Sequence, residues 1–599
     1  MRFAYISCLT LYATSIEAVV IGLNTERQFP VTNSRKSGGE ARWLHDDHQH
    51  QQIFAQDGNL QARPLDRISP LTLAEEKASG ESQNNTECES SPIIWHPPLD
   101  DKKFKFYPSV DTPGWPFVPD SRKVTYLTLV NGSPYSFNVT KKTARQMSVF
   151  DLDDVAAGES RQYVQQYQSP SFFRRWGNTK GIATYEIDCD DCVKKSFQVE
   201  ATTSGKQMAE KFTLDISANA NENSNTITTS VELNQRGGSR AYNLIISGSD
   251  KLKRYYTSVD TPVAWMHDIL DVIGERKLKH ICMLGSHDAG MSKVNGSTAF
   301  VDWRNTKTQG FNVYGQLMAG SRYLDIRPVI ANGGQYMTGH YNLPSDTPLG
   351  GNGQTLEEIV TNINDFTKDN PELVILRLTH AYNTDDGYRP MKDSEFEGAF
   401  DILEGLIHRC GGLEGDITDM KLNDLIGDGR ACVIVVTSGG IARPEKGVYG
   451  ESRAFPVLDH WSDTDSVSKM ASDQLAFLSK NRHLSFKSTK DTFLIFQWLL
   501  TLQAFENISV SDWMSIESLA VRLAYDPLFW KAWNAFTPEM YPSVILMDHI
   551  GILQQGEKHE SDDVGQAGRL GGNEIRALMI AINMAIASRN CFVGGGSIY

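Results

Sequence analysis

Several features that mark particular classes of protein are missing from this 599-residue chain. No run of about 18 uninterrupted apolar residues occurs, so no membrane-spanning helix is expected. The formal net charge of −15 argues against a nucleic-acid-binding protein, because such proteins normally carry a basic face. The same acidic balance gives no attraction to an anionic membrane, so any membrane contact is expected to be peripheral, and either local or hydrophobic.

Cysteine is also scarce, with eight residues in the whole chain. Cys8 lies in the predicted leader described below, which leaves seven cysteines. Seven is an odd number, so at least one free thiol or one intermolecular disulfide is expected in an oxidising compartment. Cys189 and Cys192 form a CxxC pair with no second pair, which argues against a zinc site. We expect a local disulfide between them.

The N-terminal residues have the pattern of a leader. A single positive charge, a short apolar run and Ile16-Glu17-Ala18 predict a signal peptide at residues 1–18, cleaved after Ala18. An ordinary disordered start is the alternative. Residues 19–97 are rich in Gln, Asn, Ser, Arg and Glu, which predicts a disordered or propeptide-like spacer. A secreted protein is therefore expected.

Asparagine-linked glycosylation is compatible with secretion. Acceptor triplets occur at Asn84, Asn138, Asn295 and Asn507. Asn131 also fits the triplet, but Pro134 follows its serine and weakens it as an acceptor. The chain is therefore expected to be a glycoprotein.

Residues 98–250 are predicted to form an antiparallel β-sandwich. Period-two alternation, regularly spaced turn residues and the lack of a long helical window are typical of that fold. The predicted strands are 124–130, 135–140, 182–187, 196–201, 211–216, 226–233 and 242–246. No catalytic set of residues occurs in this region. It is either a binding or shielding module or a structural cap, and both interpretations stay open.

Residues 255–599 alternate between apolar strand-like segments and amphipathic segments, which predicts a (β/α) barrel of the TIM type. The predicted buried strands are 281–284, 322–329, 373–378, 431–436, 493–496 and 544–547. The predicted helices are 356–368, 393–410 and 462–479, with a buried helix at 575–587. Six strands are found where a barrel needs eight. A doubly wound sheet is the alternative, but no glycine-rich dinucleotide fingerprint follows any strand.

Polar residues that suit acid–base chemistry follow or lie on these predicted strands. They are His287, Asp288, Asp325, Arg327, His340 and Asp548. The carboxyl ends of barrel strands carry the chemistry in this fold. The first and last strands of a closed barrel are neighbours, so Asp548 can approach His287. Period-two alternation places Asp325 and Arg327 on the same side of their strand.

This set of side chains is suited to phosphodiester cleavage. One histidine can act as base and the other as acid, because imidazole titrates near neutral pH. A carboxylate on the remote ring nitrogen selects the tautomer and stabilises the imidazolium. Arginine stays charged and offers a planar fork of donors to phosphate oxygens.

Three segments resemble the catalytic X domain of phosphatidylinositol-specific phospholipase C, of the metal-independent bacterial and fungal type. They are Gly285-Ser-His287-Asp288-Ala-Gly290, Gly320-Ser-Arg-Tyr-Leu-Asp325-Ile-Arg327 and Gly339-His340. The likeness covers roughly residues 260–590. It implies that His287 is the general base, paired with Asp548, and that His340 is the general acid, paired with Asp288. Arg327 would hold the phosphate and Asp325 the arginine, and the product would be a cyclic phosphate.

The resemblance also implies that no metal cofactor is needed. Calcium-dependent relatives carry an acidic ligand at the position of Arg327 and an asparagine at the position of Asp288. A fixed positive charge at Arg327 disfavours a bound cation electrostatically. The alternative is that Arg327 only pairs with Asp325 and that calcium binds elsewhere.

Substrate recognition is less well indicated. The inositol-binding relatives carry a basic residue on a middle strand and an Asp-x-Tyr pair further on. Candidates for substrate binding are Arg377, His380, Asp459, Trp461 and Trp498. The substrate is expected to be a phospholipid or another phosphodiester, and inositol recognition stays open.

Two hypotheses from different classes follow. The first is a secreted, metal-independent phosphoric diester hydrolase or lyase. The second is a non-catalytic lipid- or glycan-binding protein that uses the β-sandwich, with the barrel as its scaffold. A glycerophosphodiester phosphodiesterase is a third hypothesis, but the His-Arg-Gly motif that begins the barrel of that family and its Glu-x-Thr metal motif are not found.

Overall fold

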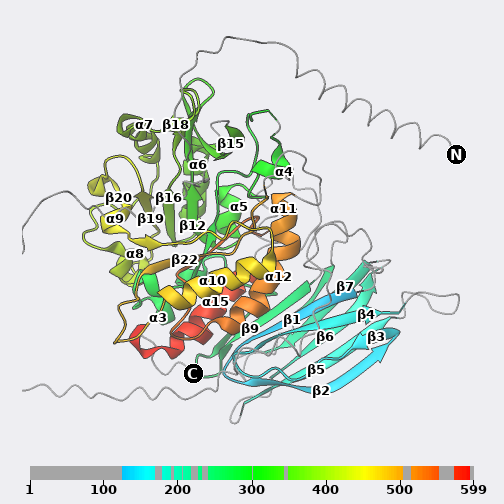
Figure 1. Cartoon of the computed structure of the whole chain (residues 1–599). Coiled ribbons are helices and arrows are strands. Elements are labelled where there is room, and N and C mark those ends of the chain that lie inside the picture. The colour runs from blue at the N-terminus through cyan, green and yellow to red at the C-terminus, as the bar shows by residue number, and fades with distance from the viewer. Residues whose placement is uncertain are drawn as a thin grey trace, which may run out of the picture. The chain divides into compact units, whose positions relative to one another are not determined.

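The computed structural model describes most of the chain beyond residue 123 (Figure 1). The described residues are 124–168, 179–189, 195–204, 207–216, 227–232, 241–299, 301–342, 348–503, 515–551 and 573–593. All of them belong to one compact unit, residues 85–599. The predicted signal peptide and spacer, and the acceptor sites Asn84 and Asn507, lie outside the described residues.

Two five-stranded sheets form the N-terminal part of the described chain. The first contains, in spatial order, β10 (Arg254–Thr257), β9 (Ala241–Ser249), β1 (Val124–Gly132), β4 (Ser160–Tyr167) and β3 (Met147–Phe150). The second contains β2 (Ser136–Arg145), β5 (Lys180–Asp188), β6 (Lys195–Ser204), β7 (Gln207–Asp215) and β8 (Ile227–Glu232). Side chains from both sheets form one hydrophobic cluster, which includes Leu127, Tyr185 and Phe197. This is the arrangement of a β-sandwich.

The sandwich differs from its prediction in two ways. Strand β1 pairs with β9 in parallel, so the first sheet is mixed rather than purely antiparallel. Strand β10 pairs with β9 and carries the sheet on to Thr257, beyond the expected boundary at residue 250. A local signal could not show the parallel pairing, because β1 and β9 are separated by more than a hundred residues of sequence.

A second region contains eight parallel strands in one curled sheet. In spatial order these are β20 (Val448–Gly450), β19 (Cys432–Thr437), β16 (Leu373–Leu378), β12 (Ser321–Ile326), β11 (Met283–Ser286), β23 (Val544–Met547), β22 (Phe493–Gln497) and β21 (Val457–Leu458). The strands follow one another in chain order, with β11 paired to both β12 and β23. This topology is compatible with a TIM-type barrel.

The sheet departs from a fully closed barrel between β20 and β21. Among the described residues no pairing joins these two strands, which are linked along the chain by α9 (Glu451–Ala454). They are also the two strands that the sequence did not reveal. At three and two residues they are too short to show a hydrophobic pattern.

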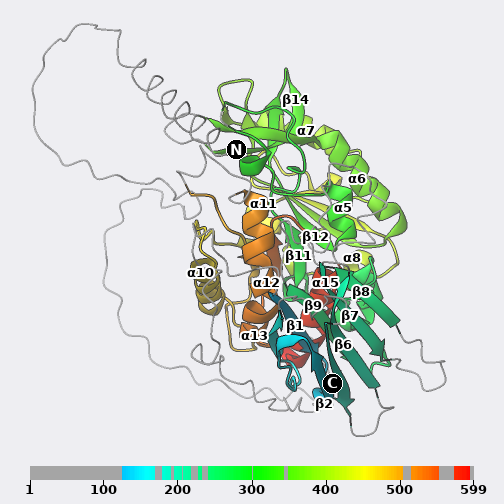
Figure 2. The same cartoon turned by 90° about the vertical axis from the view of Figure 1, so that its right-hand side faces the viewer.

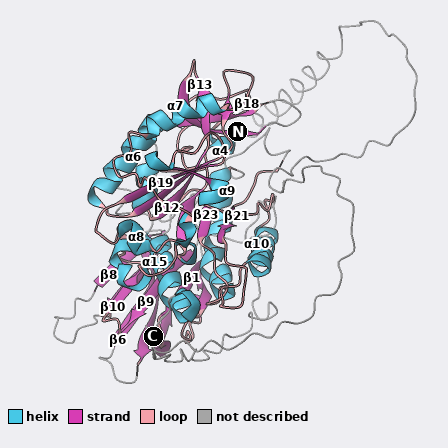
Figure 3. Ribbon diagram, turned by 90° about the vertical axis from the view of Figure 1, so that its left-hand side faces the viewer, coloured by secondary structure: helices cyan, strands magenta, loops and turns pink. Residues whose placement is uncertain are grey.

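The longer strands form because they are nearly continuous Val, Ile and Leu, as parallel strands covered on both faces should be. On β16, Val374 and Leu376 share a cluster with helices α6 (Leu356–Asp369) and α7 (Asp393–Leu403). Ile375, between them, belongs to the other large cluster. Helices α6 and α7 lie along one side of the sheet (Figure 3).

The predicted helices are found with shifted ends. Helix α6 begins after a capping box made by Thr355 and Glu358, which satisfies two free backbone N–H groups. Helix α7 ends at Leu403 rather than at residue 410, and α10 (Val467–Asn481) begins after the N-cap residue Ser466. The remaining helical segments are α2 (Trp265–Asp268), α3 (Leu270–Ile273), η3 (Leu278–His280), α4 (Trp303–Thr306), α5 (Val313–Met318), η5 (Ile417–Asp419), α8 (Leu422–Ile426), η6 (Pro444–Lys446), α11 (Ile516–Ser518), η7 (Leu519–Ala524), α12 (Tyr525–Pro527), η8 (Leu528–Ala532), α13 (Trp533–Ala535), α15 (Asn573–Ala581), η9 (Ile582–Ile586), η10 (Ala587–Arg589) and η11 (Cys591–Val593).

A third, smaller sheet adjoins the carboxyl ends of the parallel strands. Its order is β15 (Leu349–Thr355), β14 (Gln335–Asn342), β13 (Pro328–Ala331), β17 (Tyr382–Asn383) and β18 (Arg389–Pro390). Strand β13 begins two residues after β12 ends, so Arg327 is the junction between the parallel sheet and this one. The small sheet matters for the site because β14 carries His340.

The sandwich and the parallel sheet share a core. Val130 and Ile245, from the sandwich, belong to the same buried cluster as Met283 of β11 and Leu578 of α15. Helix α15 lies beside β9 in both views (Figures 1 and 2). The buried helix predicted at 575–587 is therefore confirmed. No described helix is both long and apolar enough to span a membrane.

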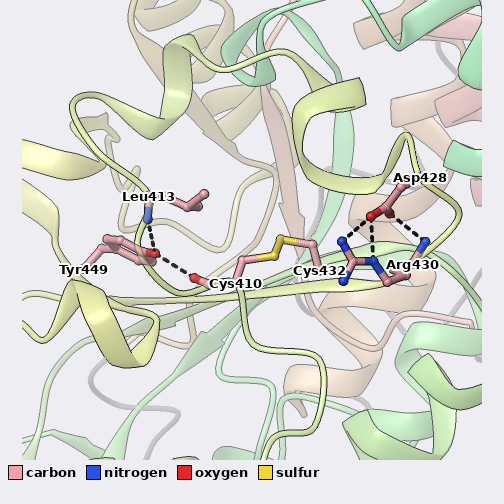
Figure 4. The surroundings of a disulfide bond; sticks show 6 residues. All are labelled: Cys410, Leu413, Asp428, Arg430, Cys432 and Tyr449. Atoms are coloured by element: carbon pink, nitrogen blue, oxygen red, sulfur yellow. Dashed lines mark hydrogen bonds and ion pairs between the residues drawn. A yellow bond between two sulfur atoms is a disulfide. The ribbon is translucent and has the colours of Figure 1, made fainter.

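The described cysteines are in two states. Cys410 and Cys432 form a disulfide that joins the segment after α7 to β19 (Figure 4), and the hydroxyl of Tyr449 donates to the carbonyl of Cys410 at 2.6 Å. Cys282 is a buried free thiol among the described residues, which agrees with the expectation of at least one. Cys189 is disulfide-bonded, but Cys192 lies outside the described residues, so the local pair stays a prediction.

Asn131 is a structural residue. Its side-chain amide donates to the carbonyls of Tyr135, Val155 and Ala156, and its oxygen accepts from Ser133. The side chain is fully buried. The turn therefore uses every hydrogen-bonding group of this amide, and this asparagine is not presented as a glycan acceptor.

Candidate active site

The six residues predicted for catalysis meet at the carboxyl ends of three neighbouring parallel strands. His287 and Asp288 follow β11, Asp325 lies on β12, and Asp548 follows β23. Strand β11 lies between β12 and β23, which places these side chains at one edge of the sheet. Leu324 and Ile326 on β12 pack toward the helices, so Asp325 points to the opposite side.

His287 is bound to Asp548, as the order of the strands predicts. Its Nδ1 lies 2.7 Å from Oδ1 of Asp548, although the two residues are 261 positions apart. The backbone N–H of His287 donates to Met547 at 3.0 Å. The side-chain amide of Gln309 donates to the carbonyls of His287 and Met547, at 2.8 and 3.1 Å. These contacts hold the ends of β11 and β23 together.

The carboxylate also sets the proton affinity of the imidazole. Burial by itself lowers the pKa of His287, but the charge and hydrogen bond of Asp548 outweigh burial and raise the pKa above its ordinary value. With the Nδ1 proton donated to Asp548, Nε2 carries the ring's lone pair. His287 therefore has the tautomer that a base acting through Nε2 needs.

Arg327 lies in the middle of the group. Its Nη2 is 2.7 Å from Nε2 of His287, its Nε donates to Asp325 at 3.3 Å, and its Nη1 is 3.7 Å from Asp288. Burial opposes the charge of the guanidinium, but Asp325 and Asp288 outweigh burial and raise the pKa of Arg327. The site therefore contains a permanent positive charge.

Asp325 is the anchor of this arginine. It also accepts hydrogen bonds from the hydroxyl of Thr379 at 2.8 Å and from the backbone N–H of Asp288 at 3.2 Å. Burial acts to raise the pKa of Asp325, but Arg327 and then His287 outweigh it and hold the pKa well below its usual range. Asp325 is therefore ionised at any pH at which the protein works.

Asp288 has few partners for a buried carboxyl. Neither of its oxygens has a hydrogen-bond partner among the described residues, and the side chain is fully buried. Burial raises the pKa of Asp288 to about 7, against the opposing charge of Arg327. Its backbone is left-handed, with φ at 40°, as are His380 at 46° and His549 at 49°. These conformations at the ends of β11, β16 and β23 are strained for residues with a Cβ and are typical of functional sites.

His340 is positioned by a backbone group rather than by a carboxylate. Its Nδ1 lies 3.1 Å from the carbonyl of Thr306, the last residue of α4. The expected pair between His340 and Asp288 is therefore wrong for this structure, because the carbonyl of Thr306 takes the nitrogen that the carboxylate would bind. Nε2 of His340 is left for another partner.

The two histidines are close but not in contact. Their ring centroids are 6.4 Å apart and the ring planes are nearly perpendicular. Burial, then the positive charges of Arg327 and His287, lowers the pKa of His340 to about 4. A negative charge between the rings would oppose these two charges and raise that pKa.

Arg377 and Asp459 are brought together, as two of the substrate-binding candidates. Nη1 of Arg377 donates to Asp459 at 2.9 Å, while Nε and Nη2 donate to Glu451 at 3.0 and 2.8 Å. Arg377 lies on β16, directly opposite Asp325 of the neighbouring strand β12. Both carboxylates lie within hydrogen-bonding distance of Arg377, whereas Arg327 has Asp325 at that distance and Asp288 beyond it, at 3.7 Å.

The three other candidates are in different environments. His380 is exposed and contacts the hydroxyl of Thr379 at 3.1 Å, and the positive charge of Arg327 lowers its pKa to about 4. Trp461 is 47% exposed and donates to Thr501. Trp498 is 1% exposed, and its ring nitrogen donates to the carbonyl of Ala524 at 2.6 Å. Trp498 is thus a core residue, and its assignment to substrate binding is wrong.

Four residues that position the site were not predicted from the sequence. Thr379 holds Asp325, Thr306 holds His340, Gln309 joins the ends of β11 and β23, and Glu451 shares Arg377 with Asp459. Thr379 follows β16 directly, so the strand-end rule that found Asp288 could also have found it. Nothing in the local sequence marks the others, because their partners are distant along the chain.

No three side chains of His, Cys, Asp or Glu are grouped to hold a metal ion in the part of the chain that the structure describes. The guanidinium of Arg327 lies between Asp288 and Asp325, the two carboxylates nearest to it. Metal independence stays a prediction.

Comparison with known proteins links the chain to phospholipases C, and no family model matches it. It is 29% identical over 153 residues to a variant-surface-glycoprotein phospholipase C of Trypanosoma cruzi, a match that covers 21% of this chain and 38% of that protein. The chain thus spans less than half the length of this curated relative.

Solved structures of bacterial phosphatidylinositol-specific phospholipases C are also similar. One from Staphylococcus aureus has a TM-score of 0.38 and 15% identity, and covers 53% of this chain and 98% of its own. One from Listeria monocytogenes has a TM-score of 0.29 and 15% identity, with 51% and 95% covered.

Proposed function

We propose that this chain is a phospholipase C-like phosphodiesterase that uses His287 and His340 as base and acid and needs no metal ion. The observation that carries the proposal is the arrangement of two histidines around one arginine, with His287 anchored to Asp548 at 2.7 Å. The sequence similarity to a phospholipase C supports it.

The reaction balances with these groups alone. Nε2 of His287 takes the proton of a substrate hydroxyl, and the oxygen attacks the neighbouring phosphorus. A bond from phosphorus to the leaving oxygen breaks, and Nε2 of protonated His340 gives that oxygen its proton. The products are a cyclic phosphate and an alcohol. Asp548 stabilises the imidazolium that forms on His287.

Arg327 supplies the charge that a metal ion supplies in other phosphodiesterases. Its planar donors can bind two phosphate oxygens, and Asp325 holds the guanidinium from the opposite side. The bound phosphate would raise the pKa of His340 from about 4 by opposing the charge of Arg327. Substrate binding thereby helps His340 to acquire the proton that it must donate.

The substrate is proposed to be a phospholipid with a hydroxyl next to its phosphate. Arg377, Asp459 and Glu451 form a compensated set of donors and acceptors that suits neutral hydroxyl groups. Trp303 and Trp461, which are 41% and 47% exposed, support peripheral contact with a membrane. Secretion is part of the proposal, and the disulfide between Cys410 and Cys432 supports an oxidising compartment.

Product analysis on a panel of phospholipids, with and without chelator, tests the proposal. We expect phosphorus NMR to show a cyclic phosphate in both conditions. His287→Ala and His340→Ala should each lower kcat by about 100-fold or more, since each removes one step of acid–base catalysis. His483→Ala is the matched control, because this histidine is about half exposed and pairs with Glu539.

Two results would contradict the proposal. One is ordinary turnover in both histidine variants, with folding verified by circular dichroism. The other is loss of all activity in chelator with recovery on adding calcium, which would leave the histidines but remove metal independence.

A further inference from the structure

The general base proposed above is not free to accept a proton in this structure. Nδ1 of His287 is bound to Asp548, so the only lone pair of the ring is on Nε2. Nη2 of Arg327 lies 2.7 Å from that nitrogen and donates to it. A substrate hydroxyl cannot give its proton to Nε2 while the arginine holds this contact.

The guanidinium has one acceptor close by that it does not use. Asp288 lies 3.7 Å from Nη1, just beyond hydrogen-bonding distance, and within the described chain both of its oxygens lack hydrogen-bond partners. A buried carboxyl without partners is unfavourable. A shift of about 1 Å would turn this approach into a charge-assisted hydrogen bond, which is among the stronger kinds.

We propose that in the free protein Arg327 blocks Nε2 of the base His287 by donating a hydrogen bond to it. A bound phosphate then draws the guanidinium toward Asp288 and frees the base. Asp288 is then a positioning residue, which acts through Arg327. This inference rests on the proposed function, because it assumes that His287 is the base.

The surroundings of Asp288 fit this role. The charged groups that face it are Arg327, Asp325, His287 and Asp548. Burial raises its pKa to about 7, so in the free protein the carboxyl is partly protonated near neutral pH. Approach of the guanidinium favours the ionised form. Asp325 keeps its contact with Nε throughout, so the guanidinium can shift while its stem stays held.

Substrate binding can drive this movement of Arg327. A ligand can shift an equilibrium only by binding one state better than the other. Phosphate can use every donor of the two Nη groups only when the Nη2 N–H that contacts the imidazole is turned from the ring. When phosphate binds, Arg327 loses one hydrogen bond to a neutral ring and gains contacts with two anions, the phosphate and Asp288.

The first test is a pair of crystal structures of the full chain, one free and one with inorganic phosphate. The inference requires the Nη2 contact with His287 to be lost in the phosphate complex. The distance from Nη1 to Asp288 should shorten to about 3 Å, as in an ordinary charge-assisted hydrogen bond. An arginine that still donates to His287 beside the bound phosphate overturns the inference, and so does failure of phosphate to bind at Arg327. This readout does not depend on turnover, so it separates the inference from the proposed function.

The second test is Asp288→Asn, compared with Asp491→Asn, a carboxylate that pairs with His280 outside the site. We expect Asp288→Asn to weaken inhibition by inorganic phosphate by about 10-fold, because the charged acceptor is lost. The rate should fall by the same factor for an alkyl and for a nitrophenyl leaving group, since a base is needed for both. A loss confined to the alkyl leaving group would place Asp288 on the acid His340 instead, and overturn the inference.

Discussion

At the scale of single residues, the histidine–aspartate contact sets the proton affinity of the site. Asp548 raises the pKa of His287 against the effect of burial. A base works in its unprotonated form, so activity should rise as pH increases through this pKa. Removing the carboxylate lowers the pKa and moves that rise to lower pH.

Asp548→Asn tests this contact. The amide can donate to Nδ1, which selects the wrong tautomer, so kcat should fall by about 100-fold to 10,000-fold. In the residual activity, the acidic limb of the pH profile of kcat/KM should shift to lower pH.

Asp473→Asn is the control for that change, because Asp473 pairs with the partly exposed His460 at 2.9 Å, away from His287. A profile that does not move in Asp548→Asn, with kcat unchanged, would show that His287 is not the titrating base.

At the scale of elements, the turn after β11 and the strand β14 depend on each other. A Cβ at Gly290 would lie 2.2 Å from the hydroxyl of Thr338 on β14, two residues before His340. The backbone N–H of Gln354 on β15 donates to the carbonyl of Gly290 at 2.9 Å. The glycine thus permits a close approach of the segment that carries the base to the sheet that carries the acid.

Gly290→Ala should therefore reduce both stability and activity. Overpacking of this kind costs about 1–3 kcal/mol, which would lower Tm by about 1–3 °C in a cooperative unit of this length. Displacement of β14 would move His340, so kcat should fall more than the loss of folded protein explains. Calorimetry and steady-state kinetics measure the two effects.

Gly450→Ala serves as its control, because a Cβ there meets Ala442 at an ordinary 3.6 Å. If Gly290→Ala keeps the Tm and kcat of the original protein, the two segments do not need this close approach.

At the scale of the whole molecule, the sandwich is part of the core of the parallel sheet. Ile245 on β9 is fully buried and belongs to the cluster that contains β11 and α15. Asn243 on the same strand donates to Glu574 of α15 at 3.2 Å, and Tyr525 donates to the same carboxyl at 2.9 Å. The sandwich is therefore joined to the region that holds the site through a buried apolar and polar contact.

The two regions should unfold in one transition. Ile245→Ala is expected to cost about 2–5 kcal/mol, as deletions from a core do, and to lower a single calorimetric Tm. Val199→Ala, in the inner core of the sandwich, should lower the same transition, with loss of activity at the same temperature. Two separated transitions, of which only one responds to either change, would contradict a shared core.

Much of the fold could be predicted from local patterns. The Val, Ile and Leu runs marked six of the eight parallel strands, and alternation marked most of the sandwich. Strands β20 and β21 were missed because two or three residues cannot show a period. The parallel pairing of β1 with β9 was missed because it joins distant segments.

Local sequence was enough to show which chemical groups lie at the ends of the strands. His287, Asp325 and Asp548 were found because a residue that follows a buried strand has to lie at the edge of the sheet. Their grouping followed from strand order, since β11 has β12 and β23 as its neighbours.

The partner that each of these groups binds depends on the folded arrangement of distant segments. His340 binds the carbonyl of Thr306 rather than Asp288, Arg327 binds His287, and Trp498 packs in the core. The physical reason is that a buried polar group takes whichever complementary group the surrounding segments bring within about 3 Å. Those segments come from distant parts of the chain, so no local pattern records the choice.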